Sequence, residues 1–343
     1  MPGRVRSAGP TIVDVQPWRR VPVRDLTEET ALQRLIVVFQ HRRQVIGSVY
    51  ARKLLGAGHD VVLLARGRRL ADLEAFGLIL EEAGSGQRTV LPVTAVSAPG
   101  VDDRFDLVLV PVRSEQLAST LPALSSMRDG SGVLFLGNTA GRQAQLVEAL
   151  GSRVLFGFPA AGGTRGGSIV RYVLIGQQQT MLGEPTGADT SPHQHLRTVL
   201  QNAGFPTTIT IDIDGWLLGH AAFVVPIAFA LYRVDTDAAR LAADRDTLRL
   251  MVRATRQAFQ ALRSTGNAAI PANLRTLHFG LPGVLAVGYW RRVLASPRGE
   301  LWFAAHTRAA PEEMRALAED LQAAVRRTGR PAPNLAKLLQ PSP

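Results

Sequence analysis

Short apolar runs alternate with helical patterns from about residue 35 to residue 185. The runs are rich in Val, Ile and Leu and are bounded by turn-forming or charged residues, which is typical of strands buried on both faces. Strands that alternate with helices favour a mostly parallel sheet whose faces are covered by those helices. The predicted strands are LIVVF (35–39), VVLLA (61–65), LILEE (78–82), LPVTAV (91–96), FDLVLVPV (105–112), GVLFLG (132–137), RVLFGFP (153–159) and SIVRYVLIG (168–176).

The pattern changes in the second half of the chain. A helix with a glycine stop is predicted at 195–204, followed by a last alternating strand at 207–214. From Trp216 to about Thr328 the patterns are almost all helical. The helices predicted there cover 216–232, 244–266 and 310–329.

The predicted helix at 216–232 is apolar on every face and long enough to suggest a membrane span. It contains His220 and Pro226, however, and no second apolar segment of this kind accompanies it. We therefore interpret it as the buried central helix of a globular domain.

The segment 35–65 has the order strand, turn, helix, strand, and Arg66 follows the second strand directly. This order is typical of the first half of a dinucleotide-binding unit. Such a unit carries G-x-G-x-x-G in its turn, because the turn is tight and the backbone must approach a pyrophosphate. The turn at 40–47 keeps only the third glycine, Gly47. The pattern therefore predicts a Rossmann-like fold with a damaged cofactor motif.

A chain of 343 residues suits two domains rather than one ordinary core. The glycine-rich stretch AAGGTRGG (160–167) lacks the Lys-Ser/Thr of a phosphate-binding P-loop, so we expect a flexible interdomain or lid loop there. The predicted fold class is α/β, with a Rossmann-like domain followed by an all-helical C-terminal domain. The expected divisions are a disordered N-terminal extension at 1–30, a Rossmann-like nucleotide-binding domain at 31–212, a helical substrate and dimerisation domain at 213–330 and a loose tail at 331–343.

Composition narrows the class of protein. Cysteine is absent, which excludes disulfides, thiolate chemistry and zinc sites with sulfur ligands. The formal net charge is +11, but all except two of the 39 basic residues are Arg, a bias that usually reflects genomic base composition. No nucleic-acid-binding motif accompanies the charge, so we expect anionic small ligands. No signal peptide is recognisable, and a cytoplasmic location is expected.

Several stretches resemble the 2-dehydropantoate 2-reductase (ketopantoate reductase) family in order and spacing over roughly 35–330. The resemblance implies NADPH-dependent reduction of a 2-keto acid, with nucleotide and substrate in the cleft between the domains. The stretches are IGSVYARKLLGAGHDVVLLARG (46–67), FDLVLVPVRSEQL (105–117), VLFLGNTAG (133–141), GFPAAGGTRGGSIVRYVLIG (157–176) and DIDGWLLGHA (212–221).

The resemblance also assigns residues. The family Lys at the end of the fourth strand corresponds to Arg113, and the Asn of the family's Asn-Gly turn to Asn138, with Thr139 in place of the glycine. Counting back from Gly329 places the family's substrate-binding glutamate at Glu313. The resemblance therefore implies that these side chains lie at the substrate and the nicotinamide.

The family's W-x-K-L-x-x-N motif, whose Lys is the proton donor, departs most from the family pattern. Trp216 is present, but Leu218 stands at the Lys position and Ala222 at the Asn position. His220 lies close to the missing Lys, and a histidine can donate a proton near neutral pH. The alternative for His220 is a core histidine bonded to a carbonyl. Glu300 and His306 are not at helical spacing, so we expect no metal site from them.

A nucleotide site is predicted around the first helix. Gly47 and Ser48 open this helix, where free N–H groups and the helix dipole attract an anion. Arg66 stands where a 2′-phosphate would lie, which favours NADP over NAD. Arg113 can hold a carboxylate or phosphate with a bidentate pair of hydrogen bonds, so we count it among the cofactor-binding residues. The alternative is that these arginines are solvated and the site has decayed.

The first functional hypothesis is an NADP-dependent oxidoreductase of ketopantoate-reductase type that reduces a 2-keto acid or related carbonyl. The predicted catalytic residues are His220, Asn138 and Glu313, and no metal is predicted. The alternative is a pseudoenzyme that keeps the two-domain cleft as a ligand-binding or structural protein, which Leu218 and Ala222 favour. The predicted partners are a small-molecule carbonyl or carboxylate substrate and a second copy of the chain, with neither nucleic acid nor membrane.

Overall fold

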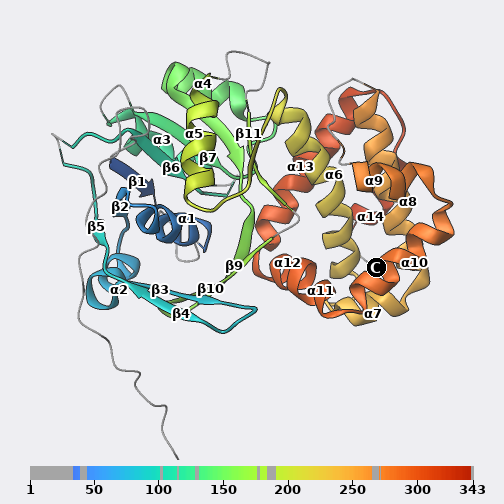
Figure 1. The fold of residues 1–343 in the computed structure, drawn as a ribbon. Helices are drawn as coiled ribbons and strands as arrows, with labels where there is room; N and C mark the ends of the chain where they lie inside the picture. The colour runs from blue at the N-terminus through green and yellow to red at the C-terminus, as the bar shows by residue number, and fades with distance from the viewer. Residues whose placement is uncertain are drawn as a thin grey trace, which may run out of the picture. The chain divides into compact units, whose positions relative to one another are not determined.

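The computed structural model describes residues 34–38, 45–100, 103–113, 116–127, 131–175, 178–183, 191–264, 270 and 272–340. They belong to one compact unit that spans Leu32–Pro343. Within the described residues, every strand precedes Ile213 and every element from Ile213 onwards is a helix (Figure 1). The predicted α/β fold with an all-helical C-terminal part is thus confirmed. The predicted extension at 1–30 and most of the turn at 40–46 lie outside the described residues.

The described residues before Ile213 form one eight-stranded sheet and one four-stranded sheet. In the large sheet every neighbouring pair is parallel except β8 with β11, so the mostly parallel sheet predicted from the apolar runs is present. Its strands lie in the order β12 (Thr207–Thr210), β11 (Thr180–Gly183), β8 (Val154–Phe158), β7 (Gly132–Leu136), β6 (Leu107–Val110), β1 (Arg34–Val38), β2 (Asp60–Leu64) and β5 (Thr94–Val96).

The large sheet buries both of its faces, as its continuous apolar strands require. Alternate residues of a strand point to opposite faces, and in β2 the pair Val61 and Leu63 packs in one core cluster while Val62 and Leu64 pack in the other. The first cluster includes side chains of α1 (Val45–Gly56) and α5 (Ser191–Asn202). The second includes side chains of α3 (Leu117–Ser125), α4 (Gln143–Leu150) and the helical part.

The small sheet contains a strand where a flexible loop was expected. Its order is β4 (Arg88–Leu91), β3 (Leu78–Glu82), β10 (Ile169–Leu174) and β9 (Ala161–Gly166). The glycine-rich stretch 160–167 forms β9, which pairs antiparallel with β10. Gly163 has φ 149°, and a Cβ there would clash with the carbonyl oxygen of Arg171. Glycine is thus needed for close strand pairing at this position, and the expectation of a flexible loop is wrong.

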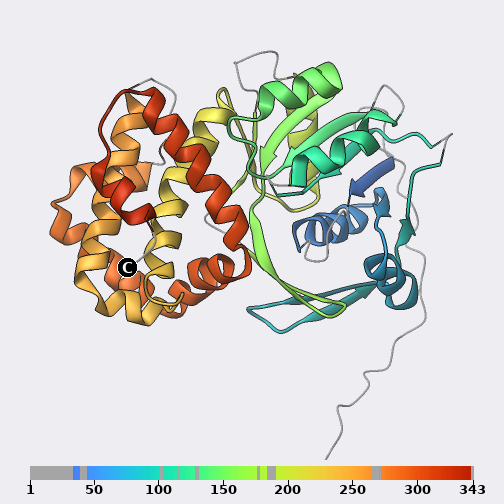
Figure 2. The same ribbon diagram turned by 180° about the vertical axis from the view of Figure 1, so that it is seen from behind.

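Helix α1 lies between the two sheets (Figures 1 and 2). Its Tyr50 is fully buried, stacks on Phe205 with ring centroids 4.0 Å apart and shares a 2.6 Å hydrogen bond with Thr180. Burial raises the pKa of Tyr50, so the phenol stays neutral. These contacts fix the helix whose first turn is the predicted anion site.

The last strand is shorter, and the helix that follows it begins earlier, than the sequence predicts. The last strand was expected to run to 214, but β12 ends at Thr210 and α6 begins at Ile213. Asp212 caps α6, because its Oδ1 accepts a 2.8 Å hydrogen bond from the N–H of Gly215. The remaining helices are α7 (Ala238–Ala243), α8 (Arg245–Arg263), α9 (Ala272–Arg275), α10 (Gly283–Leu294), α11 (Pro297–Gly299), α12 (Ala305–Ala309), α13 (Pro311–Arg327) and α14 (Pro333–Leu339).

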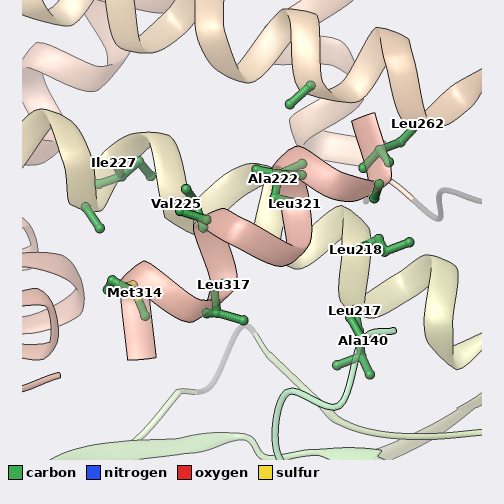
Figure 3. Packing of buried hydrophobic residues seen from close by; sticks show 14 of the residues in the cluster. Ala140, Leu217, Leu218, Ala222, Val225, Ile227, Leu262, Met314, Leu317 and Leu321 are labelled. Atoms are coloured by element: carbon green, nitrogen blue, oxygen red, sulfur yellow. The ribbon is translucent and has the colours of Figure 1, made fainter. Parts of the chain in front are cut away.

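Helix α6 (Ile213–Tyr232) is, among the described residues, the one helix long and apolar enough to cross a membrane. Of its most apolar window, 67% is buried inside the protein. Figure 3 shows Leu217, Ala222 and Val225 of α6 among the packed side chains, with Leu317 and Leu321 of α13 close by. This burial supports the interpretation of α6 as a core helix, because core helices of globular proteins share this length and composition.

The segment 331–343 was expected to be a loose tail, but it contains α14. Leu335 and Leu338 of this helix are buried, and the N–H of Asn334 donates a 2.8 Å hydrogen bond to Gln257 of α8. Arg233 also donates a 2.7 Å hydrogen bond to the carbonyl of Lys337. The flanking prolines suggested a disordered end, whereas Pro333 occupies the first turn of the helix, where proline is tolerated.

Candidate functional site

Arg113 and Asn138 follow neighbouring strands at the same edge of the large sheet. Arg113 comes shortly after β6 and Asn138 shortly after β7, and these two strands pair in parallel. The carboxyl ends of parallel strands meet at one edge, which is where open α/β sheets bind ligands. The helical part contacts this edge, because the N–H of Gly141 donates a 3.1 Å hydrogen bond to Asp214 of α6. Arg142 and Asp320 of α13 form a second contact at 3.6 Å.

Arg113 and Glu313 form an ion pair that joins the sheet edge to the first turn of α13. Arg113 Nε lies 3.2 Å from Glu313 Oε2, and the two side chains are 31% and 16% exposed. A partly buried pair of this kind is less screened by salt than a surface pair. The guanidinium has five N–H donors, and Nε is the one that faces Glu313. The fold therefore brings together two side chains that the sequence assigned to cofactor and substrate separately.

His306 extends this ion pair toward solvent. Its Nε2 lies 3.9 Å from Glu313 Oε2, and its side chain is 52% exposed. His306 belongs to α12 and Glu313 to α13, and Ala310 separates the two helices. A single continuous helix would not give this geometry, so the chain break at Ala310 and Pro311 is what places the two groups together.

His220 lies in a cluster of aromatic rings on α6. Its ring stacks on Trp216 at 5.5 Å with an interplanar angle of 7°, and it lies 4.4 Å from the ring of Phe158 at the end of β8. Burial, together with the charge of His306, lowers the pKa of His220 from 6.5 to about 4. At neutral pH the imidazole of His220 is thus uncharged, and it can offer an N–H without carrying a positive charge.

The positions of the missing Lys and Asn belong to the hydrophobic core. Leu218 is 9% exposed and Ala222 is fully buried, and both pack in the cluster that joins α6 to α13 and α8 (Figure 3). Neither side chain can donate or accept a proton. The polar and titratable side chains described at this end of the sheet and of α6 are His220, His306, Glu313, Arg113 and Asn138.

The side-chain amide of Asn138 is buried and is only partly satisfied by hydrogen bonds within the described residues. The residue is 5% exposed, and its Oδ1 accepts a 3.3 Å hydrogen bond from the N–H of Ala140. Its Nδ2 is buried and has no hydrogen-bond partner within the part of the chain that the structure describes. A buried polar group without a partner is destabilising and usually has a reason, such as a ligand that completes it.

A buried arginine that the sequence did not single out lies beside the first turns of α1. Arg69 of α2 (Arg68–Phe76) is 5% exposed and donates a 3.3 Å hydrogen bond to Ser48 in the first turns of α1. Arg165 of β9 pairs with Asp72 of α2 at 2.6 Å. Burial, together with the charge of Arg165, lowers the pKa of Arg69 to about 10, which leaves it charged at neutral pH.

Arg66, the predicted partner of a 2′-phosphate, is exposed directly after β2. A dinucleotide bound along the carboxyl edge of the sheet would meet Arg66, Ser48 of α1 and the buried Nδ2 of Asn138. Gly47 lies in the first turn of α1 as expected, whereas the preceding turn is not among the described residues. The residues present thus fit the group that the fold implies.

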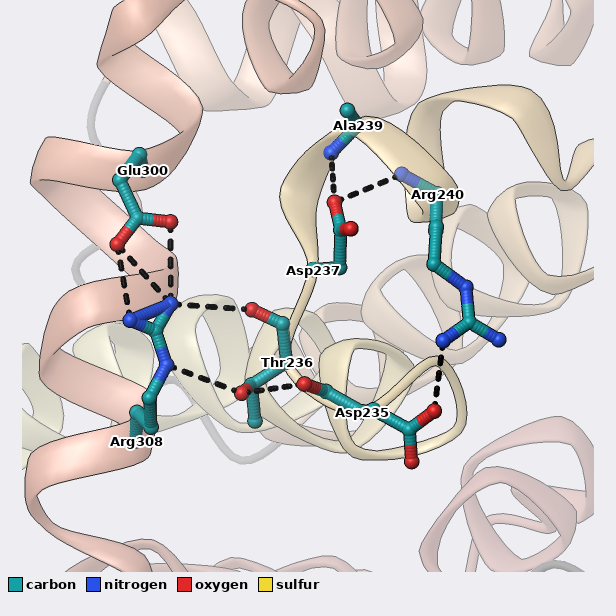
Figure 4. A network of polar contacts seen from close by, with 7 residues as sticks. All are labelled: Asp235, Thr236, Asp237, Ala239, Arg240, Glu300 and Arg308. Carbon is teal, nitrogen blue, oxygen red and sulfur yellow. Dashed lines mark hydrogen bonds and ion pairs between the residues drawn. The ribbon is translucent and has the colours of Figure 1, made fainter.

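Three features of the site were missed from the sequence: the approach of His306 to Glu313, the ring cluster around His220, and buried Arg69. The aromatic residues near His220 were a usable signal, since Trp216 and His220 are four apart on one helix face. Glu300, for which the sequence predicts no metal site with His306, is bound by Arg308 at 3.0 Å (Figure 4). No group of three His, Cys, Asp or Glu side chains is placed to hold a metal ion within the described residues.

Comparisons with known proteins agree with this fold. A sequence profile of ketopantoate reductase PanE/ApbA matches residues 45–187. The 2-dehydropantoate 2-reductase of Pyrococcus horikoshii is 28% identical over 178 residues, which span 50% of this chain and 55% of that protein. Residues 45–187 thus carry the sequence pattern of ketopantoate reductases, and the chain is similar to 2-dehydropantoate 2-reductases at low identity.

Solved ketopantoate reductase structures extend the likeness over the helical part. The structure of 2-dehydropantoate 2-reductase from Geobacter metallireducens superposes with a TM-score of 0.72 at 19% identity and covers 89% of this chain and 97% of its own. A D-mandelate dehydrogenase in a ternary structure with NADH and anilino(oxo)acetate superposes with a TM-score of 0.70 at 14% identity, covering 89% and 96%. At these identities the structures show a shared fold.

Proposed function

We propose that this chain is an NADP-dependent oxidoreductase that reduces the keto group of a 2-keto acid. The observation that carries the proposal is the Arg113–Glu313 pair at the carboxyl edge of the sheet, beside the buried orphan donor of Asn138. A cation that suits a carboxylate and a donor that suits a carbonyl, at the edge where open α/β sheets bind ligands, support this reaction. The relatives that share the fold are named as reductases and dehydrogenases, which supports the same class of reaction.

The cofactor of the proposed reaction is a nicotinamide dinucleotide, which supplies a hydride. Ser48 and the N–H groups that open α1 would hold the pyrophosphate, since a helix N-terminus favours anions. Exposed Arg66 would hold the 2′-phosphate of NADP. The similar D-mandelate dehydrogenase structure contains NADH rather than NADPH. The proposed preference of this chain for NADP therefore rests on Arg66 alone.

The substrate of the proposed reaction carries a carboxylate next to a carbonyl. Arg113 can bind the carboxylate with donors other than the Nε that faces Glu313. Glu313 holds the guanidinium in place and can accept from a hydroxyl of the substrate. Asn138 Nδ2 can donate to the carbonyl oxygen or to the nicotinamide amide, which would satisfy its buried amide.

His220 is the proposed group next to the substrate oxygen. Because its pKa is about 4, it acts near neutral pH as an uncharged N–H donor that stabilises developing negative charge on the oxygen. A neutral imidazole is known to serve as an electrophile in this way. Imidazolium donation by His220 would be confined to acidic solution, below the range expected from the sequence.

The alternative of a pseudoenzyme rests on Leu218 and Ala222, which remove the Lys and Asn of the family motif. No comparison supports it, since the relatives carry names of active enzymes. A homodimer remains a prediction, and the exposed apolar side chains of Val284, Leu285 and Tyr289 on α10 are surface available for it. A cytoplasmic location and the absence of nucleic-acid and membrane partners likewise remain predictions.

Titration with NADPH, followed by fluorescence or calorimetry, tests the cofactor first. Consumption of NADPH with a panel of 2-keto acids that includes ketopantoate then tests the reaction. Arg113→Ala should abolish turnover while NADPH still binds, and Arg104→Ala, in a loop before β6, is a matched control that should leave both unchanged. Failure of the wild-type chain to bind NADPH would contradict the proposal.

A further inference from the structure

Reduction of a carbonyl needs a proton source as well as a hydride, and the family residue for this role is absent. Leu218 occupies the Lys position and is packed in the core. His220, the nearest titratable group on the same helix, is uncharged at neutral pH because of its burial and of His306. The proposed reaction at this site thus lacks an assigned group that can give up a proton at neutral pH.

The geometry of His306 suits that task. Its Nε2 lies 3.9 Å from Glu313 Oε2, and Glu313 is held from the other side by Arg113 at 3.2 Å. Half of the His306 side chain is open to solvent, so it can exchange protons with water, whereas Glu313 is mostly covered. His306 is therefore joined to the substrate-binding pair at one end and to solvent at the other.

Helix α12, which carries His306, is fixed by its neighbours. Arg308 of α12 holds Glu300 through both terminal nitrogens at 3.0 Å and donates from Nε to Thr236 at 3.2 Å (Figure 4). Tyr232 at the end of α6 donates a 3.1 Å hydrogen bond to the carbonyl of Thr307. These bonds on both sides of α12 hold it against the helix that carries His220.

We propose that His306, paired with Glu313, supplies the proton to the substrate oxygen in this chain and so replaces the lysine of the family. The inference rests on the proposed function above. As the hydride forms a C–H bond at the carbonyl carbon, the π electrons of the C=O bond move to the oxygen. The N–H bond of imidazolium His306 breaks and an O–H bond forms, directly or through a bound water. A bound reduced nicotinamide dinucleotide would supply the hydride and be oxidised, and His306 regains its proton from solvent.

The charged and titratable groups that face His306 come from three elements. The carboxylate of Glu313 in α13 lies 3.9 Å from it, and Arg113 beyond β6 pairs with the same carboxylate at 3.2 Å. His220 of α6 is coupled to it electrostatically, because the charge of His306 contributes to the low pKa of His220. Glu313 is thus a positioning residue that holds the imidazole of His306.

The first test compares the steady-state kinetics of His306→Gln with those of wild type and of His195→Gln. His195 is an exposed histidine on α5 and is a matched control. Loss of a general acid typically lowers the rate about 10²–10⁴-fold, so His306→Gln should lower kcat by this factor with NADPH affinity unchanged. Free imidazole should restore part of the rate of a His306→Ala variant, because position 306 is open to solvent. A structural role would not give this rescue.

A second test has a readout other than activity. The NMR chemical shift of the His306 Cε1 proton should change in Glu313→Gln, because the carboxylate that lies 3.9 Å from its Nε2 is removed. A chemical shift that does not change overturns the pairing. Full activity of His306→Gln in a chain whose wild type turns over overturns this inference and leaves the proposed function intact. A wild type that binds NADPH but reduces no 2-keto acid overturns both.

Discussion

Arg113 Nε lies 3.2 Å from Glu313 Oε2, which ties the end of β6 to the first turn of α13. The contact orients a guanidinium on a side chain that is still partly open to solvent. An arginine that is already oriented loses less freedom when it binds a carboxylate, which favours affinity for the substrate. His306 Nε2 lies 3.9 Å from the same carboxylate of Glu313.

Arg113→Lys should raise the KM for a 2-keto acid about tenfold or more, with a smaller effect on NADPH binding. Lysine keeps the charge but loses the planar fork that holds a carboxylate with two hydrogen bonds. Steady-state kinetics with a fixed saturating concentration of NADPH measure this effect. Glu313→Gln is the companion variant, and the double variant shows whether the two residues act as a unit. An unchanged KM in Arg113→Lys would remove Arg113 from substrate binding.

Arg66→Ala should weaken NADPH binding by about 1.5–3 kcal/mol, or roughly 10- to 100-fold, and leave NADH binding nearly unchanged. The reason is that only NADPH carries the 2′-phosphate that Arg66 is placed to bind. Arg68→Ala, at the neighbouring exposed arginine, is the control. Calorimetric titration of both cofactors measures the difference. Equal losses for the two cofactors would show that Arg66 does not select the phosphate.

Leu218→Lys should restore little activity and should lower stability. Leu218 is 9% exposed within an apolar cluster, so a lysine there would lose its hydration without gaining a charged partner. Urea denaturation should show a lower midpoint, whereas Leu218→Met, which conserves volume, should keep the midpoint close to that of wild type. Strong gain of ketopantoate reduction in Leu218→Lys would mean that the rest of the family site is intact.

Stability should fall as the pH drops from 6.5 toward about 4. Burial, with Arg256 close by, lowers the pKa of His278 from 6.5 to about 4, and His220 shows the same shift. Between these values the unfolded chain binds more protons than the folded chain, so the free energy of unfolding decreases with decreasing pH. Urea midpoints near neutral pH and near about pH 5 measure the slope. His278→Gln should reduce it, and a slope that does not change would mean that His278 titrates normally.

The strands of the large sheet can be predicted from the sequence because each is a run of apolar residues with its own turn signals. Val61 to Leu64 are all buried, so no polar position interrupts the run. β9 could not be predicted in this way. Its glycines carry no hydrophobic signal, and the strand exists because of its pairing with β10 and the close backbone approach at Gly163. Helix α14 is a similar case, since burial of Leu335 and Leu338 against other helices stabilises a short helix.

The candidate site could be predicted in part for a comparable reason. Arg113 and Asn138 follow recognisable strands, and parallel strands bring their ends to one edge. Glu313 was placed by its distance from Gly329 along one helix and the following turn. The approach of His306 to Glu313 depends on the break between α12 and α13, and the low pKa of His220 depends on burial. Local pattern contains no information on either, because both arise from packing between distant elements.

The apolar pair Leu218 and Ala222 also limits which substitutions the chain can accept during evolution. A return to the family motif needs a lysine and an asparagine together, and each alone would place a polar group in a packed core without its partner. Either single step would lower stability before any chemistry returned, and selection removes variants that fall below the stability needed to function. The packing of α6 therefore disfavours a return to the family motif. Substitutions at the edge of the site, at residues such as His306, are better tolerated.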